Sequence, residues 1–411
     1  MLILNAKKNK LKQNKKQVNT KPIVFITVAC SFFIDHRVNQ ELASLIKNGF
    51  YAYILSWDRE RKYSDKETEN YYVKNAKLLD ANKFSKILFL LSAILFQFLI
   101  VFYGIKLIRK HKRMIIHAND FNTLAGVIFL KMIFPNRIQV IYDSHEFTRF
   151  VYKEWYGPIV GNIVTSLEIK FIKYFDKIIT VSTPIKKYLE TISNKDVKVI
   201  WNYPTESLLP KISKAKAKKA LGLKVNDFVL IYIGTLRIDV ALFELISAVS
   251  ILKEKQLTPN LKILIVGDGP FLHQIHEMVE KNHLSDFVRI IGRVEREKAM
   301  NYLRAADISY ILFSLKGMNT KIGMPWKLFE SLLNETRVLT MTDTYAAHFA
   351  KKYNVGYTVA SITPIEIANT ISTIYKQKIK DDFHIPQKFV WENQEDEFIK
   401  IYLELIQESK S

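Results

Sequence analysis

The sequence has almost no cysteine, and it has too few acidic residues to balance its basic ones. Cys30 is the single cysteine among 411 residues. This excludes a disulfide framework and a zinc site built on several cysteines, and it fits a reducing cytosol. Lys and Arg number 61 against 40 Asp and Glu, a net charge of +21. Such a basic chain indicates an anionic partner: nucleic acid, a phosphate-rich small molecule or an anionic membrane surface.

Several chemical signatures are also missing. There is no G-x-x-x-x-G-K-[ST] loop, so a P-loop ATPase is excluded. The turn G-D-G-P-F-L departs from G-x-G-x-x-G at Leu272, which argues against a dinucleotide site. No Asp-x-Asp pair occurs, and His273 and His276 lack a third ligand. We therefore predict no metal site and no resident cofactor.

The first 21 residues carry seven lysines and no acid. We expect a disordered basic tail, either solvated or attracted to anionic lipid. No apolar stretch follows the basic residues directly, so we expect no secretory signal.

The longest uncharged run spans residues 87–105 and is followed by Lys106, Arg109, Lys110, Lys112 and Arg113. Its length permits a transmembrane helix. A buried core helix is a second interpretation. In a third, segment 84–112 lies in the cytoplasmic leaflet, with its apolar face in lipid and its basic end on headgroups.

Elsewhere the chain alternates short β-branched runs with helical stretches, with 48% hydrophobic residues overall. This pattern is typical of βαβ units and parallel sheets. We predict an α/β protein with two Rossmann-like, doubly wound domains, residues 22–205 and 206–388, facing a central cleft. Residues 389–408 are predicted to form one amphipathic helix, within a terminal segment 389–411 that returns to the first domain.

In open parallel sheets, ligands bind beyond the carboxyl ends of the strands. Two glycine-containing turns follow strands of the second domain, and a proline precedes a later helix, so free amides there are suited to phosphate. The candidate donor-binding residues in these turns and at this helix are Gly234, Thr235, Arg237, Gly267, Asp268, Gly269, Pro325, Lys327, Leu328 and Glu330. In the first domain, His145 and Asp120 follow strands and are candidates for hydrogen bonding or proton transfer.

Nine short motifs occur in an order that resembles a known family, the GT-B fold glycosyltransferases of family 4 (group 1). They are D-H-R-V-N-Q-E-L at 35–42, H-A-N-D at 117–120, Y-D-S-H-E at 142–146, I-T-V-S at 179–182, I-W-N-Y-P at 200–204, Y-I-G-T-L at 232–236, V-G-D-G-P at 266–270, I-G-R-V at 291–294 and M-P-W-K-L-F-E at 324–330. The resemblance covers nearly the whole chain after residue 21.

The resemblance implies roles for particular residues. Glu330 matches the glutamate that holds the ribose of the donor, and His145 matches the histidine that meets the donor sugar. The Gly234 turn would face the diphosphate, with Arg293 in the same site. Asp35 and Arg37 would meet donor phosphate or acceptor in the early loop, which we group with Asp120.

The resemblance also implies a retaining transfer from a UDP- or GDP-sugar to a glycan or lipid-linked acceptor. Amides at helix ends, Arg237 and Lys327 would stabilise the leaving diphosphate without a metal. We expect a peripheral protein on the inner face of the cell membrane that makes cell-surface polysaccharide and binds no nucleic acid.

Two departures from the family pattern keep other functions open. Ile322 replaces the first glutamate of the family's Glu-x7-Glu motif, and Val240-Ala241 replaces a basic residue followed by glycine. A non-catalytic protein that binds a nucleotide sugar or glycan as the partner of another transferase is therefore the alternative. A nucleic-acid binder and an epimerase of the same fold are more distant ones.

Overall fold

The computed structural model describes residues 21–78, 86–314, 317–377 and 389–408. It divides the chain into two units, residues 1–200 with 394–411 and residues 201–393. The predicted basic tail lies outside the described residues except for Lys21. The two units are described separately below.

The first domain is built on one eight-stranded sheet, in the order β3-β4-β2-β1-β5-β6-β7-β8. All neighbouring strands are parallel except β3 and β4. Both central strands, β1 and β5, are buried along their whole length, as expected when helices cover both faces. The strands are β1 (Ile23–Val28), β2 (Ala52–Trp57), β3 (Lys66–Glu67), β4 (Tyr71–Ala76), β5 (Met114–Asn119), β6 (Ile138–Ser144), β7 (Lys177–Thr180) and β8 (Val197–Val199).

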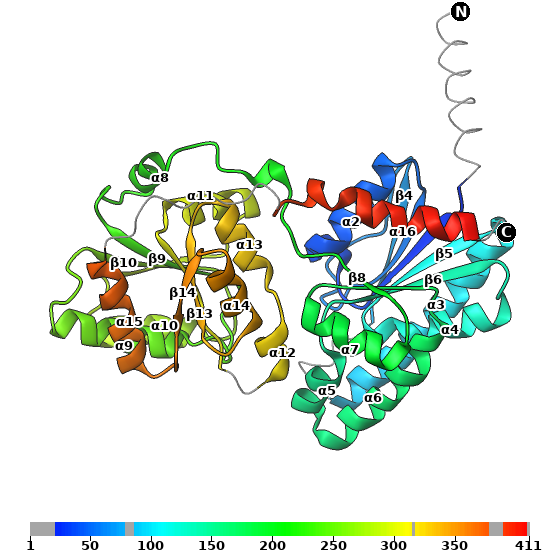
Figure 1. The fold of residues 1–411 in the computed structure, drawn as a ribbon, viewed down its shortest axis with the longest axis horizontal. Coiled ribbons are helices and arrows are strands. Elements are labelled where there is room, and N and C mark those ends of the chain that lie inside the picture. The colour runs from blue at the N-terminus through cyan, green and yellow to red at the C-terminus, as the bar shows by residue number, and fades with distance from the viewer. Residues whose placement is uncertain (1–20, 79–85, 315–316, 378–388, 409–411) are drawn as a thin grey trace, which may run out of the picture. The chain divides into compact units, whose positions relative to one another are not determined.

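Helices lie on both sides of this sheet. Figure 1 shows α2 and α16 on one side and α3, α4, α6 and α7 on the other. The helices of the first domain are α2 (His36–Lys47), α3 (Lys86–Lys110), α4 (Leu124–Ile133), α5 (Thr148–Tyr156), α6 (Pro158–Phe171), α7 (Thr183–Ser193) and α16 (Glu395–Glu408). Within the described residues, α3 is the one helix long and apolar enough to span a membrane, and 28% of its apolar window, which has a mean hydropathy of 2.4, is buried.

The second domain is a six-stranded sheet in the order β11-β10-β9-β12-β13-β14, with every pair parallel. Its strands are β9 (Phe228–Ile233), β10 (Leu261–Val266), β11 (Val288–Gly292), β12 (Ile308–Ile311), β13 (Arg337–Met341) and β14 (Gly356–Val359). Its helices are α8 (Lys214–Ala220), α9 (Leu242–Glu254), α10 (Leu272–Lys281), α11 (Arg296–Ala305), α12 (Met318–Ile322), α13 (Trp326–Leu333), α14 (Tyr345–Lys352) and α15 (Pro364–Lys376). The α/β class and the two parallel-sheet domains predicted from the sequence are therefore present.

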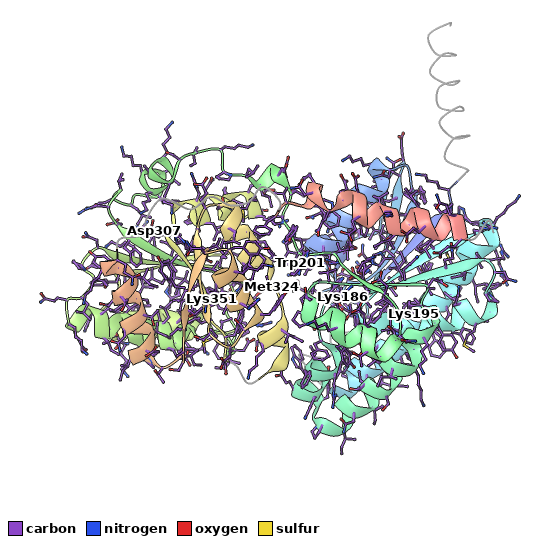
Figure 2. The ribbon with its side chains drawn as sticks, viewed as in Figure 1. Lys186, Lys195, Trp201, Asp307, Met324 and Lys351 are labelled. Carbon is purple, nitrogen blue, oxygen red and sulfur yellow. The ribbon has the colours of Figure 1, made fainter. Side chains whose placement is uncertain are left out.

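The chain passes between the domains earlier than residue 205. Trp201 packs against a second-domain cluster that contains Met324 and Phe329, and Figure 2 shows Trp201 and Met324 close together. The side-chain amide of Asn202 donates a hydrogen bond to the Met324 carbonyl at 3.3 Å. The sequence I-W-N-Y-P thus begins the second domain and is not a linker that follows the first.

The helix predicted over residues 389–408 is present only from Glu395 onward, as α16, and its expected start at residue 389 is wrong. Phe389 and Val390 are buried in the second domain, and the Trp391 amide donates to the Pro204 carbonyl at 2.9 Å. A short 3-10 helix, Trp391–Asn393, follows, and α16 then packs on the first domain. The chain changes domains at this point, so one straight helix cannot satisfy both sets of contacts.

Candidate functional site

In the first domain, His145 follows β6 and lies between two carboxylates. Its Nε2 is 3.1 Å from Asp143 Oδ2, and its Nδ1 is 3.5 Å from Asp120 Oδ2. The backbone N–H of His145 also donates to Asp120 Oδ1 at 3.0 Å. Adjacent parallel strands place these residues together, because β5 and β6 end at the same edge of the sheet. Two of the predicted site residues, His145 and Asp120, therefore meet.

The two carboxylates determine the charge of this histidine. Burial by itself disfavours an imidazolium, but the Asp120 and Asp143 charges outweigh burial and raise the pKa of His145 to about 10. His145 is therefore a cation at neutral pH. Both ring N–H groups of the imidazolium face these carboxylates, so His145 is held in one orientation and is not suited to act as a general base.

Asp120 holds its position at a cost in backbone strain. Its φ is +59° and its ψ is 166°, a conformation that residues other than glycine rarely adopt. Strain of this kind costs about 1–3 kcal/mol and is found mainly at functional sites. Its hydrogen bond from His145 fixes the carboxylate at the end of β5. The structure thus supports Asp120 as a candidate binding residue.

The predicted contact of Arg37 with donor or acceptor is wrong, because its side chain is only 3% exposed. The guanidinium donates to both Asp143 oxygens, at 2.8 and 3.1 Å, and to the Ile200 carbonyl at 2.8 Å. Arg37 and His145 together hold the pKa of Asp143 well below its usual range, against the opposing effect of burial. Arg37 therefore positions the carboxylate that orients His145.

Asp35, the other early-loop residue, caps α2. Its Oδ1 accepts from the Val38 amide at 3.1 Å, and its Oδ2 accepts from Cys30 Sγ at 3.2 Å. An aspartate at this position satisfies one of the free amides at the start of a helix. Its predicted contact with a ligand stays a prediction.

A buried carboxylate and histidine lie beside this network. Ligand atoms of Glu41, His117 and Asp143 all lie within 4.8 Å of one another, a spacing compatible with a metal ion. The Arg37 Nε, however, is 3.0 Å from Glu41 Oε1 and 2.8 Å from Asp143 Oδ2. We assign the cluster to this guanidinium, because a second cation among the same oxygens would be repelled.

Tyr402 joins this network from α16, because its hydroxyl hydrogen-bonds to His117 Nδ1. Both residues are fully buried. In Tyr402→Phe the imidazole loses its partner, and we expect the free energy of unfolding of the first domain to fall by about 1–3 kcal/mol. Hydrogen exchange of amides in β5 measures this loss. The control is Tyr174→Phe, on an exposed tyrosine, and equal exchange in the two variants would contradict the role of Tyr402.

A pocket of about 250 Å³ opens at the ends of β1 and β5 in the first domain. Its lining combines polar groups with an aromatic wall, and includes Ala29, Arg59, Asp120, Glu146, Tyr152 and Trp155. Aromatic faces beside hydrogen-bonding groups suit a sugar or another amphipathic ligand. Of the predicted residues, Asp120 lines this pocket, whereas Arg59, Tyr152 and Trp155 had no motif that singled them out.

In the second domain, the two glycine turns pack directly on each other. A Cβ on Gly267 would lie 1.9 Å from the Gly234 carbonyl oxygen, and both residues have positive φ. The amides of Gly234 and Gly267 donate to the carbonyls of Val266 and Gly292, at 3.0 and 2.8 Å. These two amides are thus engaged within the sheet edge. The glycines let the turns approach each other closely, and their contact with a donor stays a prediction.

Lys327 lies over the Gly234 turn. A Cβ on Gly234 would be 3.2 Å from Lys327 Nζ, and the ammonium also lies 4.6 Å from the centre of the Tyr232 ring. Burial, aided by the charge of Arg237, lowers the pKa of Lys327 to about 8. A desolvated ammonium beside two turns is poised for an anion. Lys327 and Gly234, predicted from separate motifs, are therefore brought together.

Glu330 lies one turn further along α13 and is held by a residue that the sequence did not indicate. Arg296 donates two hydrogen bonds to Glu330 Oε1, from Nε at 3.0 Å and Nη2 at 2.7 Å. Arg296 begins α11 within the charged stretch E-R-E-K, which has the composition of a solvated helix start. No sequence signal distinguished it from its charged neighbours.

The remaining predicted residues are placed as follows. Leu328 is wholly buried and its amide donates to the Pro325 carbonyl at 3.0 Å, and its contact with a donor stays a prediction. Pro325 precedes α13 as its N-cap, as expected. The Thr235 carbonyl accepts from the Tyr232 hydroxyl, Asp268 accepts from the Gly269 amide, and Arg293 is exposed after β11.

Arg237 and the Val240-Ala241 pair show how this site departs from the family pattern. Arg237 is half exposed and pairs with Asp239, through contacts of 2.9 and 2.6 Å. Val240 and Ala241 are buried, and the Ala241 carbonyl accepts from the Tyr310 hydroxyl at 2.6 Å. The pair therefore belongs to the core, which leaves Lys327 and Arg237 as the cations near the Gly234 turn.

Comparison with known proteins gives these residues a context. Residues 213–387 match the model of the family described as glycosyl transferases group 1. An uncharacterized glycosyltransferase of Methanocaldococcus jannaschii is 28% identical over 202 residues, 46% of this chain and 47% of that protein. The putative teichuronic acid biosynthesis glycosyltransferase TuaC of Bacillus subtilis is 28% identical over 176 residues, 42% of this chain and 40% of that protein. The match thus spans about half the length of these curated relatives.

Among solved structures, HepE of Anabaena in complex with UDP has a TM-score of 0.62. Its sequence is 14% identical, and the alignment covers 94% of this chain and 98% of that one. At this identity the likeness shows the fold alone, and it extends over both domains described above.

Proposed function

Because this chain is a GT-B protein of the group 1 glycosyltransferases, we propose that it moves a sugar from a nucleotide-diphosphate sugar to a hydroxyl acceptor. The observation that carries this proposal is the arrangement on α13. Lys327 presents a half-buried ammonium over the Gly234 turn, and Glu330 presents a carboxylate fixed by Arg296. A cation for a diphosphate and an acceptor for ribose hydroxyls lie three residues apart on one helix.

In this proposal the nucleotide sugar binds the second domain. The Anabaena protein with the same fold was solved with UDP, which supports a nucleoside diphosphate as the ligand class. Cleavage of the sugar–phosphate bond leaves negative charge on the diphosphate. Lys327 would stabilise this developing charge more than the ground state, which is the condition for lowering the barrier. The reaction as proposed needs no metal.

The first domain would bind the acceptor in the pocket lined by Asp120 and Tyr152. As the family resemblance implies, we propose that His145 meets the sugar that is transferred. We propose that transfer retains the anomeric configuration, as the family resemblance implies. We further propose a lipid-linked glycan acceptor at the inner face of the cell membrane, in polysaccharide synthesis, which the likeness to TuaC supports.

A thermal-shift panel of UDP- and GDP-sugars tests the donor site. A donor at about 100 times its dissociation constant should stabilise the second domain by roughly 2.7 kcal/mol. In Glu330→Gln the ribose contact weakens, and we expect this stabilisation to disappear at the same donor concentration. The matched control is Glu335→Gln, on an exposed glutamate just beyond the same helix. An equal shift in wild type and Glu330→Gln would contradict the site.

The alternative is a nucleotide-sugar-binding protein without catalysis, which the burial of Val240 and Ala241 in the core favours. Release of free nucleoside diphosphate from the stabilising donor separates the two functions. An enzyme releases it at a rate that depends on acceptor, whereas a binding protein gives a thermal shift without release.

A further inference from the structure

Exposed hydrophobic side chains gather on one part of the first domain. Of the twenty-one large hydrophobic residues that are exposed among the described residues, fourteen lie on α3, α4, α5 and α6. They include Leu90 and Phe98 on α3, Met132 on α4 and Ile159 on α6, at 61%, 67%, 61% and 75% exposure. An exposed apolar surface of this kind, larger than scattered single residues, indicates an interaction site.

The helices that carry these side chains are fixed in the domain. One side of α3 is buried through Phe96, Ile100 and Ile108. A Cβ on Gly126 of α4 would lie 2.8 Å from the Gln97 carbonyl of α3, so the two helices are in close contact. Helix α4 is also in contact with α6. Figure 1 shows α3, α4 and α6 in one layer on the same side of the sheet. We call the exposed side chains of this layer, with Trp155, the apolar face.

This packing favours one of the three interpretations of the uncharged run. Between β4 and β5, which belong to one sheet, α3 is the crossover helix. A helix that spans a bilayer would have to leave this sheet and lose its buried side. A wholly buried helix would not expose Phe98 at 67% and Phe102 at 60%. The helix has one apolar side packed in the domain and another apolar side free, as expected for a helix that lies in the plane of a lipid surface.

The charge around the apolar face indicates the chemistry of the surface that it binds. Within α3, α4 and α6 the only acidic residue is Glu168, which is buried and accepts from the Tyr142 and Tyr188 hydroxyls. Basic residues border the face: Lys106, Arg109 and Lys110 near the end of α3, Lys112 and Arg113 after it, Lys170 at the end of α6 and Lys173 just beyond it. On α5, Glu154 is exposed beside Trp155, but α3, α4 and α6 carry no exposed acid. An apolar surface on these three helices with a cationic border matches an anionic lipid surface.

We propose that the apolar face docks in the plane of an anionic phospholipid leaflet. Its apolar side chains enter the headgroup–acyl boundary while the basic border contacts lipid phosphates. A second copy of this chain fits less well, because it would bring the same cationic border against itself. The docking surface is therefore a layer of three helices and not the single segment 84–112 expected from the sequence.

This docking also gives the acceptor pocket an orientation, a step that depends on the proposed function. Trp155 belongs to the apolar face and also lines the pocket at the end of β1. Phe89, at the start of α3, lines the same pocket and stacks on Tyr156 with 6.1 Å between ring centres. A glycan headgroup carried by a lipid would thus enter the pocket from the membrane side.

Vesicle co-sedimentation tests the proposal. We expect the full chain to sediment with vesicles of phosphatidylcholine plus phosphatidylglycerol, and less with phosphatidylcholine alone or at high salt. Phe98→Glu with Phe102→Glu on α3, and separately Ile159→Glu with Ile163→Glu on α6, should each lower partitioning by about tenfold or more. Ile365→Glu, at a residue 64% exposed on α15, is the matched control and should bind as wild type.

Four outcomes would overturn the proposal, and three of them concern the face as a whole. They are unchanged binding in both α3 and α6 variants, equal binding to neutral and anionic vesicles, or a dimer in sedimentation analysis that Phe98→Glu dissociates. Loss of binding in the α3 variant alone would also overturn it, because the face would then be one helix. Nucleoside diphosphate release from the donor, assayed in detergent, should be the same in all variants. If no variant and no wild-type protein releases nucleoside diphosphate, the proposed function is contradicted, whereas the docking proposal is not.

Discussion

Lys327→Met should lower kcat/KM for transfer from the nucleotide sugar by about 100- to 1000-fold, because it removes a desolvated charge at the developing negative charge of the diphosphate. Methionine fills a similar volume between the rings of Tyr232 and Phe313, so the second domain should keep its fold. Steady-state kinetics with the donor found in the thermal-shift panel measures the effect. Lys281→Met, on an exposed lysine of α10, is the control.

The pH profile gives this prediction a second readout. Burial lowers the pKa of Lys327 to about 8, so the free protein loses this charge as the pH rises through that value. We expect kcat/KM to fall above about pH 8 in the wild type, since this ratio reports groups of the free enzyme. In Lys327→Met the same alkaline decline should be absent. A wild-type profile that is flat to pH 10, or an unchanged decline in the variant, would contradict the role of Lys327.

The second large effect concerns stability. Arg37→Met leaves the Asp143 carboxylate buried without its guanidinium, and loss of one partner from a buried pair costs about 3–5 kcal/mol. The contact between Arg37 and Asp143 is 2.8 Å, and both side chains are almost fully buried. Hydrogen exchange in β5 and β6 isolates the loss to the first domain, which a single unfolding curve of a two-domain chain cannot do.

The matched control for Arg37 is Arg237→Met. Arg237 also pairs with an aspartate, Asp239 at 2.6 Å, but its side chain is 52% exposed. Exposed pairs contribute about 0–1 kcal/mol, so exchange in β9 and β10 should change little. Comparing the same substitution at the two arginines therefore separates the effect of burial from the effect of ion pairing on stability. If the free energy of unfolding falls by the same small amount in both variants, the Arg37 network does not stabilise the first domain as predicted.

The sequence predicted most of the strands because buried parallel strands read as continuous β-branched runs. It missed β3, β4 and β14. β3 is only two residues long, and the sequences of β4 and β14, Y-Y-V-K-N-A and G-Y-T-V, mix polar or glycine positions with apolar ones. Such segments lie away from the sheet centre, where packing decides more than local pattern. The helix predicted over residues 389–408 was started too early for a similar reason. Its periodicity continues through a point where the chain leaves one domain for the other.

Part of the candidate site could be predicted from the sequence, for a different reason. Residues directly after strands, such as His145 and Asp120, follow from topology because parallel strands end at one edge. The sequence predicted that Arg37 meets a ligand from the early loop, yet its side chain points inward to Asp143. The position of a residue in a motif does not show which way its side chain points. Arg296 reaches Glu330 across 34 positions of chain. Contacts of that range depend on how α11 and α13 pack, which no local pattern contains.

The return of α16 to the first domain has a consequence for how the protein is made. Residues 201–393 form one continuous unit, whereas the first domain needs residues 394–411 as well. On the ribosome, the second domain can therefore complete its fold while the first still lacks its last helix. Until Tyr402 has been synthesised, His117 has no hydroxyl partner. The first domain, although it leaves the ribosome first, is thus the one whose fold is completed last.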